Sequence, residues 1–273
     1  MSASEQEYVL GTNDAELRRL GFQHQVWAAP TAASWERARF RPGQRVLDVG
    51  CGPGYATFDL ADLVTPSGGV VAVDVSQRFV AHLDAERARR GYAHVEPHVQ
   101  DLEQLAIEDA SVDGAFARWV LCWVRDPEEV VRRVARALRP GGAFVVLDYC
   151  HYEALMMAPR GAATDRIIRA VTESFRQSGG NPDVGRDVPA MMQRAGLEIE
   201  TLRPIVRLAR PGTALWEWPW RFFENFLPGL VASGGLSADD HAAFRREWAE
   251  RSRDPAAWLL TPPMVEVIGR RRA

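Results

Sequence analysis

The sequence predicts an α/β protein in which helices cover both faces of a mainly parallel sheet. Three observations carry this prediction. Short apolar runs alternate with segments of helical periodicity, a glycine-rich turn joins the first run to a helix, and acidic residues stand where several runs end. Such alternation is typical of βαβ units. A chain of 273 residues, 47% of them hydrophobic, is long enough to bury a large core.

Residues 1–42 are expected to form a helical arm ahead of the first strand. Asn13 and Glu16 have the spacing of a capping box, which marks a helix start. A second short helix is expected over residues 31–39, because a Pro-Gly pair then breaks the helical pattern.

Seven strands and several helices follow from apolar runs and capping signals. The clearest helix start is Asp126, which is followed by a proline and two acids that favour the positive end of the helix dipole. A helix over residues 187–195 is expected to end at Gly196. The expected strands cover residues 46–49, 69–74, 94–99, 112–117, 143–148, 197–208 and 264–268, and further helices cover residues 164–177, 215–226 and the stretch after Ser237.

Composition excludes several classes of function. All 33 basic residues are arginine, so any chemistry that needs a lysine amine is excluded. The net charge of −3 argues against a nucleic-acid partner. Three cysteines without metal-like spacing predict neither a metal site nor a disulfide framework, which fits a reducing cytoplasm. The N-terminus lacks a signal-peptide pattern and no apolar run reaches membrane length, so we expect no membrane association.

The turn after the first strand carries glycines at Gly50, Gly52 and Gly54. Glycine tolerates positive φ and lets the backbone approach a ligand closely. The dinucleotide fingerprint would place a third glycine where this sequence has Tyr55. A generic glycine turn between a strand and a helix is the alternative interpretation.

Polar residues stand at or just beyond the ends of successive strands: Asp48, Asp74, Asp101, Arg118 and His151. The carboxyl ends of parallel strands meet at one edge of a sheet, where such folds bind ligands. A carboxylate at the second strand end can accept hydrogen bonds from a ribose diol. The alternative for Asp74 is a solvent-exposed carboxylate at a strand end that binds no ligand.

Together, the loop and these strand ends resemble the class I S-adenosylmethionine (SAM) dependent methyltransferases, which have a Rossmann-like, doubly wound, seven-stranded sheet. The segment from Ala117 to Trp123 resembles the motif after the family's fourth strand, and the segment from Tyr8 to Gln23 resembles the leader of a bacterial small-molecule subgroup. The resemblance implies that SAM is the cofactor, with no metal. The implied SAM contacts are Asp48, Gly50, Cys51, Gly52, Gly54, Asp74, Val75, Asp101, Leu102, Arg118, Tyr8 and Gln23.

The resemblance also implies one domain, 1–273, in which residues 43–150 form the SAM-binding core. Residues 151–182 and 209–261 are expected to form lid or substrate insertions, and residues 183–208 and 262–273 complete the sheet. The expected substrate-binding side chains are Trp119, Trp123, Trp216, Trp220 and Phe223. For the first two, the alternative is core packing. For the last three, it is a dimer contact or helix packing.

A methyl group passes from a sulfonium by in-line displacement, and a hydroxyl acceptor must also lose its proton to a base. His151 is the first base candidate and His24 the second, with a surface or capping role as the alternative. We therefore expect methyl transfer from SAM to O, N or C of a small molecule, such as a secondary metabolite with an apolar or aromatic part, by a monomer or homodimer. A SAM-binding relative without transferase activity, cyclase-like or regulatory, and an NAD-type oxidoreductase remain alternatives.

Overall fold

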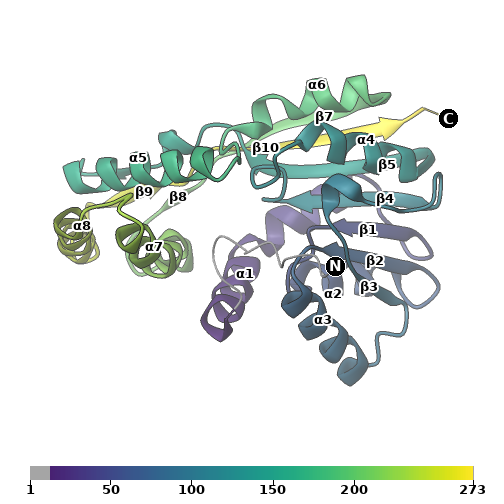
Figure 1. The fold of residues 1–273 in the computed structure, drawn as a ribbon, viewed down its shortest axis with the longest axis horizontal. Helices are drawn as coiled ribbons and strands as arrows, with labels where there is room; N and C mark the ends of the chain where they lie inside the picture. Colours follow the sequence, from purple (N-terminus) through teal and green to yellow (C-terminus); the bar gives the residue numbers. More distant parts are fainter. Residues whose placement is uncertain (1–12, 273) are drawn as a thin grey trace.

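A computed structural model, which describes residues 13–272, contains the predicted sheet (Figure 1). The strands of the large sheet lie in the order β3-β2-β1-β4-β5-β10-β7. All neighbours pair in parallel except β10, which runs antiparallel to both of its neighbours. From one edge to the other, the strands are β3 (Val95–Val99), β2 (Gly69–Asp74), β1 (Arg45–Val49), β4 (Val112–Arg118), β5 (Leu138–Tyr149), β10 (Met264–Arg271) and β7 (Leu197–Ile205).

Eight α-helices are present in the described part of the chain. They are α1 (Asp14–Arg37), α2 (Tyr55–Val64), α3 (Gln77–Arg90), α4 (Pro127–Ala137), α5 (Ala162–Gln177), α6 (Val188–Arg194), α7 (Ala214–Ala232) and α8 (Ala238–Arg251). Three short 3₁₀ turns accompany them: η1 (Leu102–Gln104), η2 (Tyr152–Ala154) and η3 (Val184–Arg186). Several predicted caps are confirmed, since the side chains of Asn13, Ser76, Asp126 and Ser237 accept from backbone N–H groups of their first turns.

The strand order reverses between β1 and β4. From β1 the chain moves through α2 and α3 towards β3, and from β4 it moves through α4 towards β5. Because parallel crossovers are right-handed, these two sets of helices cover opposite faces of the sheet. The doubly wound fold is thereby confirmed, and the crevice where the order reverses is the expected ligand site.

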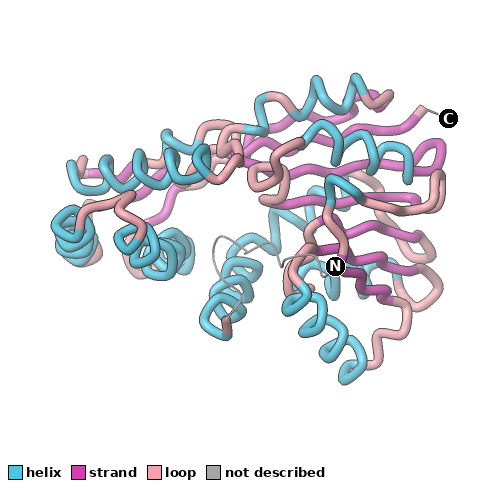
Figure 2. The backbone as a smooth tube through the Cα atoms, in the orientation of Figure 1, coloured by secondary structure: helices cyan, strands magenta, loops and turns pink. Residues whose placement is uncertain are grey.

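A second, three-stranded sheet was not predicted. It pairs β6 (Met156–Ala158) with β9 (Trp258–Leu260), and β9 with β8 (Leu208–Ala209). The predicted strand over residues 197–208 therefore ends earlier, at Ile205. Figures 1 and 2 show this small sheet beside α5, α7 and α8, at one end of the large sheet. The two insertions thus form a common body at that end.

The prediction of two helices in the N-terminal arm is wrong, because α1 continues through Pro30. A proline has no N–H to donate to the carbonyl four residues earlier, here that of Val26. Arg207 supplies the missing donor, since its guanidinium donates to the Val26 carbonyl at 2.8 Å. The cation also lies 5.1 Å from the centre of the Trp27 ring. A contact from a distant loop, which local sequence cannot reveal, keeps the helix continuous.

The end of α1 is tied to the sheet by an ion pair. The Glu266 side chain on β10 is 1% exposed, and its two oxygens accept from Arg37 at 2.6 and 2.5 Å. The pair holds α1 against the antiparallel strand, and α1 in turn borders the crevice described below.

Replacing Arg37 with methionine is expected to lower the free energy of unfolding by about 2–3 kcal/mol at pH 7. The change leaves a buried carboxylate without its partner, and the value is reduced from that of a fully buried pair because Arg37 is partly exposed. Urea unfolding would measure it. The control is Arg39→Met, which breaks the more exposed contact with Glu200. Equal losses of unfolding free energy in both variants would contradict the claim that the buried Glu266 carboxylate depends on Arg37.

Candidate active site

A cavity opens at the carboxyl ends of β1, β2, β4 and β5, at the reversal point of the sheet. Its walls are completed by side chains from α1, α5 and α7. Together with its open mouth, it has a volume of about 1040 Å³.

The glycine turn forms one wall of this cavity. Gly52 has a φ of +54°, and a Cβ placed on it would meet no atom within 4 Å, so this residue borders free space. Gly54 differs, because its Cβ would lie 2.3 Å from Leu83 Cδ1 and its φ is +90°. Gly54 serves the packing of the turn on α3 and does not line the cavity, whereas Gly50 and Cys51 do line it.

Asp48 lies beneath the turn and is 2% exposed. Its carboxylate accepts from the Thr57 hydroxyl at 2.6 Å. Burial raises the pKa of Asp48 to about 6, although the Thr57 hydrogen bond and the charge of Arg118 pull it the other way. The carboxyl group therefore carries an electrostatic cost at neutral pH that a cation in the cavity would relieve.

Asp74, at the end of β2, joins the turn to its neighbouring strand. One carboxylate oxygen accepts from the Gly52 N–H at 2.8 Å and the other accepts from the Ser76 N–H at 2.9 Å. Burial raises the pKa of Asp74, and these backbone hydrogen bonds oppose the shift. Since the side chain lines the cavity, lone pairs that the backbone does not use face a ligand.

Arg118, at the end of β4, is held by α1. Its guanidinium donates to the Thr31 hydroxyl at 2.6 Å and lies 3.4 Å from His24 Nδ1. The other ring nitrogen of His24 lies 3.0 Å from the Asp59 carboxylate. Burial lowers the pKa of Arg118 to about 10, against the attraction of Asp48 and Asp59. The side chain keeps its positive charge at neutral pH.

The two histidine candidates differ in position. His24 lines the cavity. His151 is exposed, outside the cavity, with its Nδ1 2.8 Å from Arg186. The expectation that His151 faces the reaction centre is therefore corrected. It follows β5 as predicted, but the chain has already turned into η2 there, and the side chain points to the surface.

The cavity is also lined by a set of rings that we call the aromatic wall. Trp119 and Trp218 stack at 5.7 Å between centroids, and Trp123 stacks on Phe175 at 4.0 Å. Trp119 has a φ of +55°, a strained conformation for a tryptophan. The wall consists of Trp119, Trp123, Tyr149, Tyr152, Phe175 and Trp218, all of which line the cavity.

The late aromatic run is divided between two faces of α7. Trp216, Trp220 and Phe223 pack on the side chains of α8, with Phe223 5.2 Å from Phe244 and Trp220 5.4 Å from Trp248. They do not line the cavity, which corrects the expectation for these three residues. The other face carries Trp218 and Phe222 into it.

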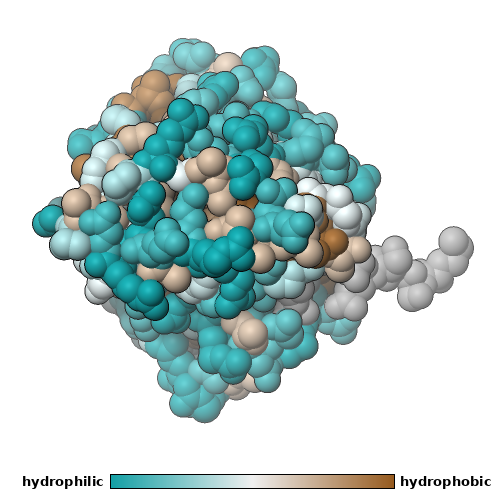
Figure 3. Space-filling view, turned by 90° about the vertical axis from the view of Figure 1, so that its left-hand side faces the viewer, coloured by the Kyte–Doolittle hydropathy of each residue, from teal (hydrophilic) through white to brown (hydrophobic). Residues whose placement is uncertain are grey.

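Helix packing thus accounts for the aromatic side chains on the α8 side. The outer surface at this end of the molecule is mostly hydrophilic, with apolar atoms scattered over it (Figure 3).

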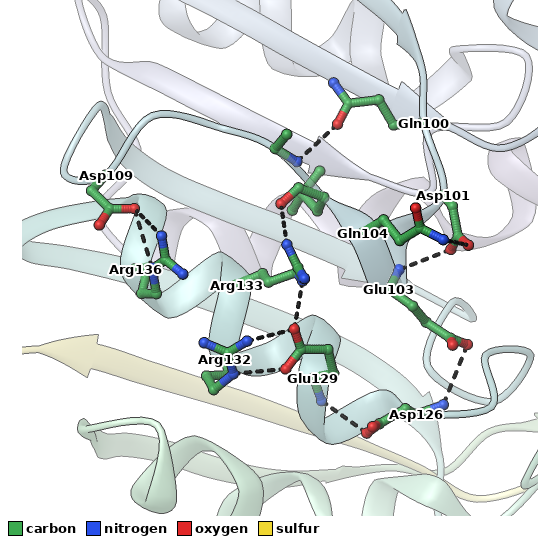
Figure 4. A network of polar contacts seen from close by, with 12 residues as sticks. Gln100, Asp101, Glu103, Gln104, Asp109, Asp126, Glu129, Arg132, Arg133 and Arg136 are labelled. Carbon is green, nitrogen blue, oxygen red and sulfur yellow. Dashed lines mark hydrogen bonds and ion pairs between the residues drawn. The ribbon is translucent and has the colours of Figure 1, made fainter.

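Several expected SAM contacts lie away from the cavity. Asp101 caps η1, where its carboxylate accepts from the Glu103 N–H at 2.9 Å, and Gln104 lies beside it (Figure 4). Leu102 is buried, and neither it nor Val75 lines the cavity. Tyr8 lies outside the described residues. Gln23 does line the cavity, where its side-chain oxygen accepts from Arg19 and from the Trp218 indole, at 3.0 Å each.

The sequence-based predictions missed four of the six rings of the aromatic wall, namely Tyr149, Tyr152, Phe175 and Trp218, and one charged residue of the cavity. Tyr149 is the last residue of β5, so the rule that strand ends face the ligand edge would have found it. Tyr152 and Phe175 depend on how η2 and α5 fold back, which no local pattern shows. Arg19 was seen only as part of the leader pattern, and it reaches the cavity because α1 packs against α7.

Comparisons with known proteins agree with this architecture. Residues 47–146 match the family described as methyltransferase domain. The chain is 34% identical over 183 residues to an uncharacterized 37.1 kDa protein of a Streptomyces fradiae transposon, covering 64% of this chain and 49% of that protein. It is 38% identical over 102 residues to the nocamycin O-methyltransferase of Saccharothrix syringae, covering 37% of this chain and 36% of that protein.

A structure of a putative methyltransferase from Bacillus halodurans has the same fold, with a TM-score of 0.61 at 18% identity over 90% of this chain and 100% of that one. Residues 47–146 are thus similar to the methyltransferase domain family, and the fold is that of the class I SAM-dependent methyltransferases, a family whose methyl donor is SAM. It spans about half or less of the length of the two curated relatives named above.

Residues 13–272 contain neither a membrane-spanning helix nor a cluster of metal ligands. No helix there is long and apolar enough to cross a membrane. No three His, Cys, Asp or Glu side chains in that range are placed to share a metal ion.

Replacing Asp48 with asparagine is expected to raise the free energy of unfolding, measured without cofactor, by about 1–2 kcal/mol at pH 7.5. The gain comes from removing a carboxyl whose pKa is raised by burial to about 6, and the cost of burying the new amide offsets part of it. The folded-state pKa lies above the unfolded value of about 3.9. The buried carboxyl therefore costs no stability below pH 4, and its cost grows as the pH rises to about 6. Urea unfolding at pH 4 and pH 7.5 would show the gain only at the higher pH.

The matched control is Asp84→Asn, whose carboxyl on α3 is largely exposed and whose loss should change stability by less than about 0.5 kcal/mol. An Asp48→Asn protein that is no more stable than the parent at pH 7.5 would show that this carboxyl is not strained by burial.

Proposed function

We propose that this protein transfers a methyl group from SAM to a small-molecule acceptor. The observation that carries the proposal is a single cavity with two unlike walls. One wall is a glycine turn with buried acids, and the other is a set of six aromatic side chains. Residues 47–146, the part that matches the family, contribute the turn. The similarity to a nocamycin O-methyltransferase supports an acceptor of small-molecule size.

The residues on the first wall fit SAM. The space beside Gly52 that a Cβ would otherwise enter admits a ligand close to the backbone. Asp48 and Asp74 place negative charge near a cofactor that carries a sulfonium and an ammonium, while Arg118 offers a cation for its carboxylate. Gln23 on α1, whose side-chain oxygen accepts from Arg19 and Trp218, stays a predicted cofactor contact. Asp74 would accept from the ribose hydroxyls, as expected from its place at the end of β2.

The expected SAM contacts of Val75, Asp101 and Leu102 stay predictions. Asp101 is engaged as the cap of η1. A change in the loop after β3 would be needed to bring it to the cavity.

When bound, SAM supplies an electrophilic methyl group whose bond to sulfur breaks while the sulfur keeps the electron pair. The chain's contribution is to hold acceptor and donor in line and to exclude water, which provides up to about 7–11 kcal/mol of the barrier reduction. Trp119 and Trp218, which stack on one another, form the rigid part of the surface against which an acceptor would lie.

His24 is the histidine that the cavity offers, but both ring nitrogens have partners. Because Arg118 can only donate, His24 Nδ1 accepts, and Nε2–H then donates to Asp59. In this state His24 orients Arg118 and is a positioning residue. An acceptor such as an amine that is already neutral at the working pH needs no base from the protein before it attacks the methyl group.

The cellular compartment and the oligomeric state of the protein stay proposals as well. The three cysteines are free, two of them buried, which supports a reducing cytoplasm. A monomer and a homodimer both remain predictions.

The Asp74→Asn variant is expected to bind SAM about 10- to 100-fold more weakly than the parent, because hydrogen bonds to a charged group contribute roughly 1.5–3 kcal/mol each. Isothermal titration calorimetry would measure this. Asp84→Asn is the comparison, since its carboxyl on α3 is exposed and outside the cavity, and its affinity should stay within about threefold of the parent. An unchanged affinity for Asp74→Asn would remove that carboxylate from the site.

The activity itself is tested in two steps. Calorimetry of the parent protein should show SAM binding and no binding of NAD⁺ or NADH, and the opposite preference would overturn the proposal in favour of an oxidoreductase. Release of S-adenosylhomocysteine in the presence of candidate acceptors then separates a methyltransferase from a relative that binds SAM without transferring its methyl group.

A further inference from the structure

The aromatic wall is continuous although its rings come from five places in the chain. Trp119 and Trp123 follow β4, Tyr149 ends β5, Tyr152 lies in η2, Phe175 in α5 and Trp218 in α7. Neighbouring centroids are 4.0–6.0 Å apart along the series. Flat apolar surfaces of this kind bind ring-shaped ligands by offset stacking and edge contacts.

Charge at this wall is already compensated. Two cations reach it. The Glu16 carboxylate holds the Arg19 guanidinium by two hydrogen bonds of 2.7 Å. A third nitrogen of Arg19 donates to Gln23, and Asn225 donates to Glu16. Arg118 lies 5.0 Å from the centre of the Trp119 ring, and the proposed function assigns it to the carboxylate of the cofactor. With the cofactor or S-adenosylhomocysteine bound in that way, an anion placed against the wall would find no unpaired cation among residues 13–272.

Two tyrosine hydroxyls provide the polar groups of the wall. Tyr149 and Tyr152 line the cavity, and within the described residues neither hydroxyl has a hydrogen-bond partner. Burial raises the pKa of both, with nearby Arg19 offsetting part of the shift. Each therefore keeps its proton over the ordinary pH range and can donate to an oxygen. The indole N–H of Trp119 is a third buried donor without a partner.

We propose that the aromatic wall binds an uncharged acceptor with a planar ring, whose hydroxyl or carbonyl oxygen meets the hydroxyls of Tyr149 and Tyr152. The inference rests on the proposed function, because it names the acceptor class for that reaction. An anionic acceptor loses its hydration here without gaining a counter-ion. A cationic acceptor is repelled by the sulfonium of the donor.

Three matched probes test the proposal on protein saturated with S-adenosylhomocysteine: 2-naphthol, naphthalene and 2-naphthoate. Calorimetry should show 2-naphthol binding most tightly and naphthalene about 5- to 10-fold more weakly, as expected for a lost hydrogen bond. The 2-naphthoate anion should bind at least about tenfold more weakly than naphthalene. Equal or tighter binding of 2-naphthoate overturns the proposal, as does a lack of binding by all three probes.

A double variant, Tyr149→Phe with Tyr152→Phe, tests the polar part. It should reduce 2-naphthol to the affinity of naphthalene and leave naphthalene unchanged. The control is Tyr92→Phe, whose hydroxyl lies outside the cavity next to Asp62 and Arg90, and it should change neither affinity. If the double variant keeps the preference for 2-naphthol, the hydroxyls do not contact the ligand.

The titration of S-adenosylhomocysteine itself is recorded first, so the two failures are distinguishable. Absence of that binding contradicts the proposed function, and 2-naphthol and naphthalene titrated into the protein alone then still report on the aromatic wall. Binding of S-adenosylhomocysteine with the wrong order of probes contradicts only the acceptor class.

Discussion

The hydrogen bond from the Gly52 N–H to the Asp74 carboxylate is the contact on which the rest of the site depends. It ties the turn after β1 to the end of β2, and so fixes the open side of the glycine turn towards the cavity. The packing of Gly54 on Leu83 sets the other side of the turn, where even a methyl group does not fit. These two contacts hold the backbone of the turn along the edge of the sheet where ligands bind.

Electrostatics and shape divide the cavity into two halves. The half beside the turn contains Arg118 and the carboxyl groups of Asp48 and Asp74, whose pKa values are raised by burial. This combination of charges suits a cofactor that carries a sulfonium, an ammonium and a carboxylate group. The half formed by the aromatic wall contains hydroxyls and a compensated ion pair between Arg19 and Glu16. Helix α1 serves both halves, since it contributes His24 to the first and Arg19 and Gln23 to the second.

Local sequence was sufficient to predict the strands of the large sheet and the glycine turn, because strand patterns, cap residues and glycines can be recognised within a few residues. It was insufficient where distant segments decide the outcome. Pro30 remains inside a helix only because Arg207 reaches the carbonyl it leaves unpaired. Which face of α7 meets the cavity depends on how α8 packs, so Trp218 was missed and Trp220 chosen. His151 and His24 were both visible, but the direction of a side chain after a strand end depends on the turn that follows.

The central claim is that the turn after β1 holds the adenosyl sulfonium cofactor with its methyl group towards the aromatic wall. A crystal structure of the protein with S-adenosylhomocysteine tests it most directly. The account predicts density along Gly52, with the ribose hydroxyls on Asp74 and the sulfur facing Trp119. A ligand seated elsewhere, or a dinucleotide bound in this crevice while S-adenosylhomocysteine is refused, would contradict it.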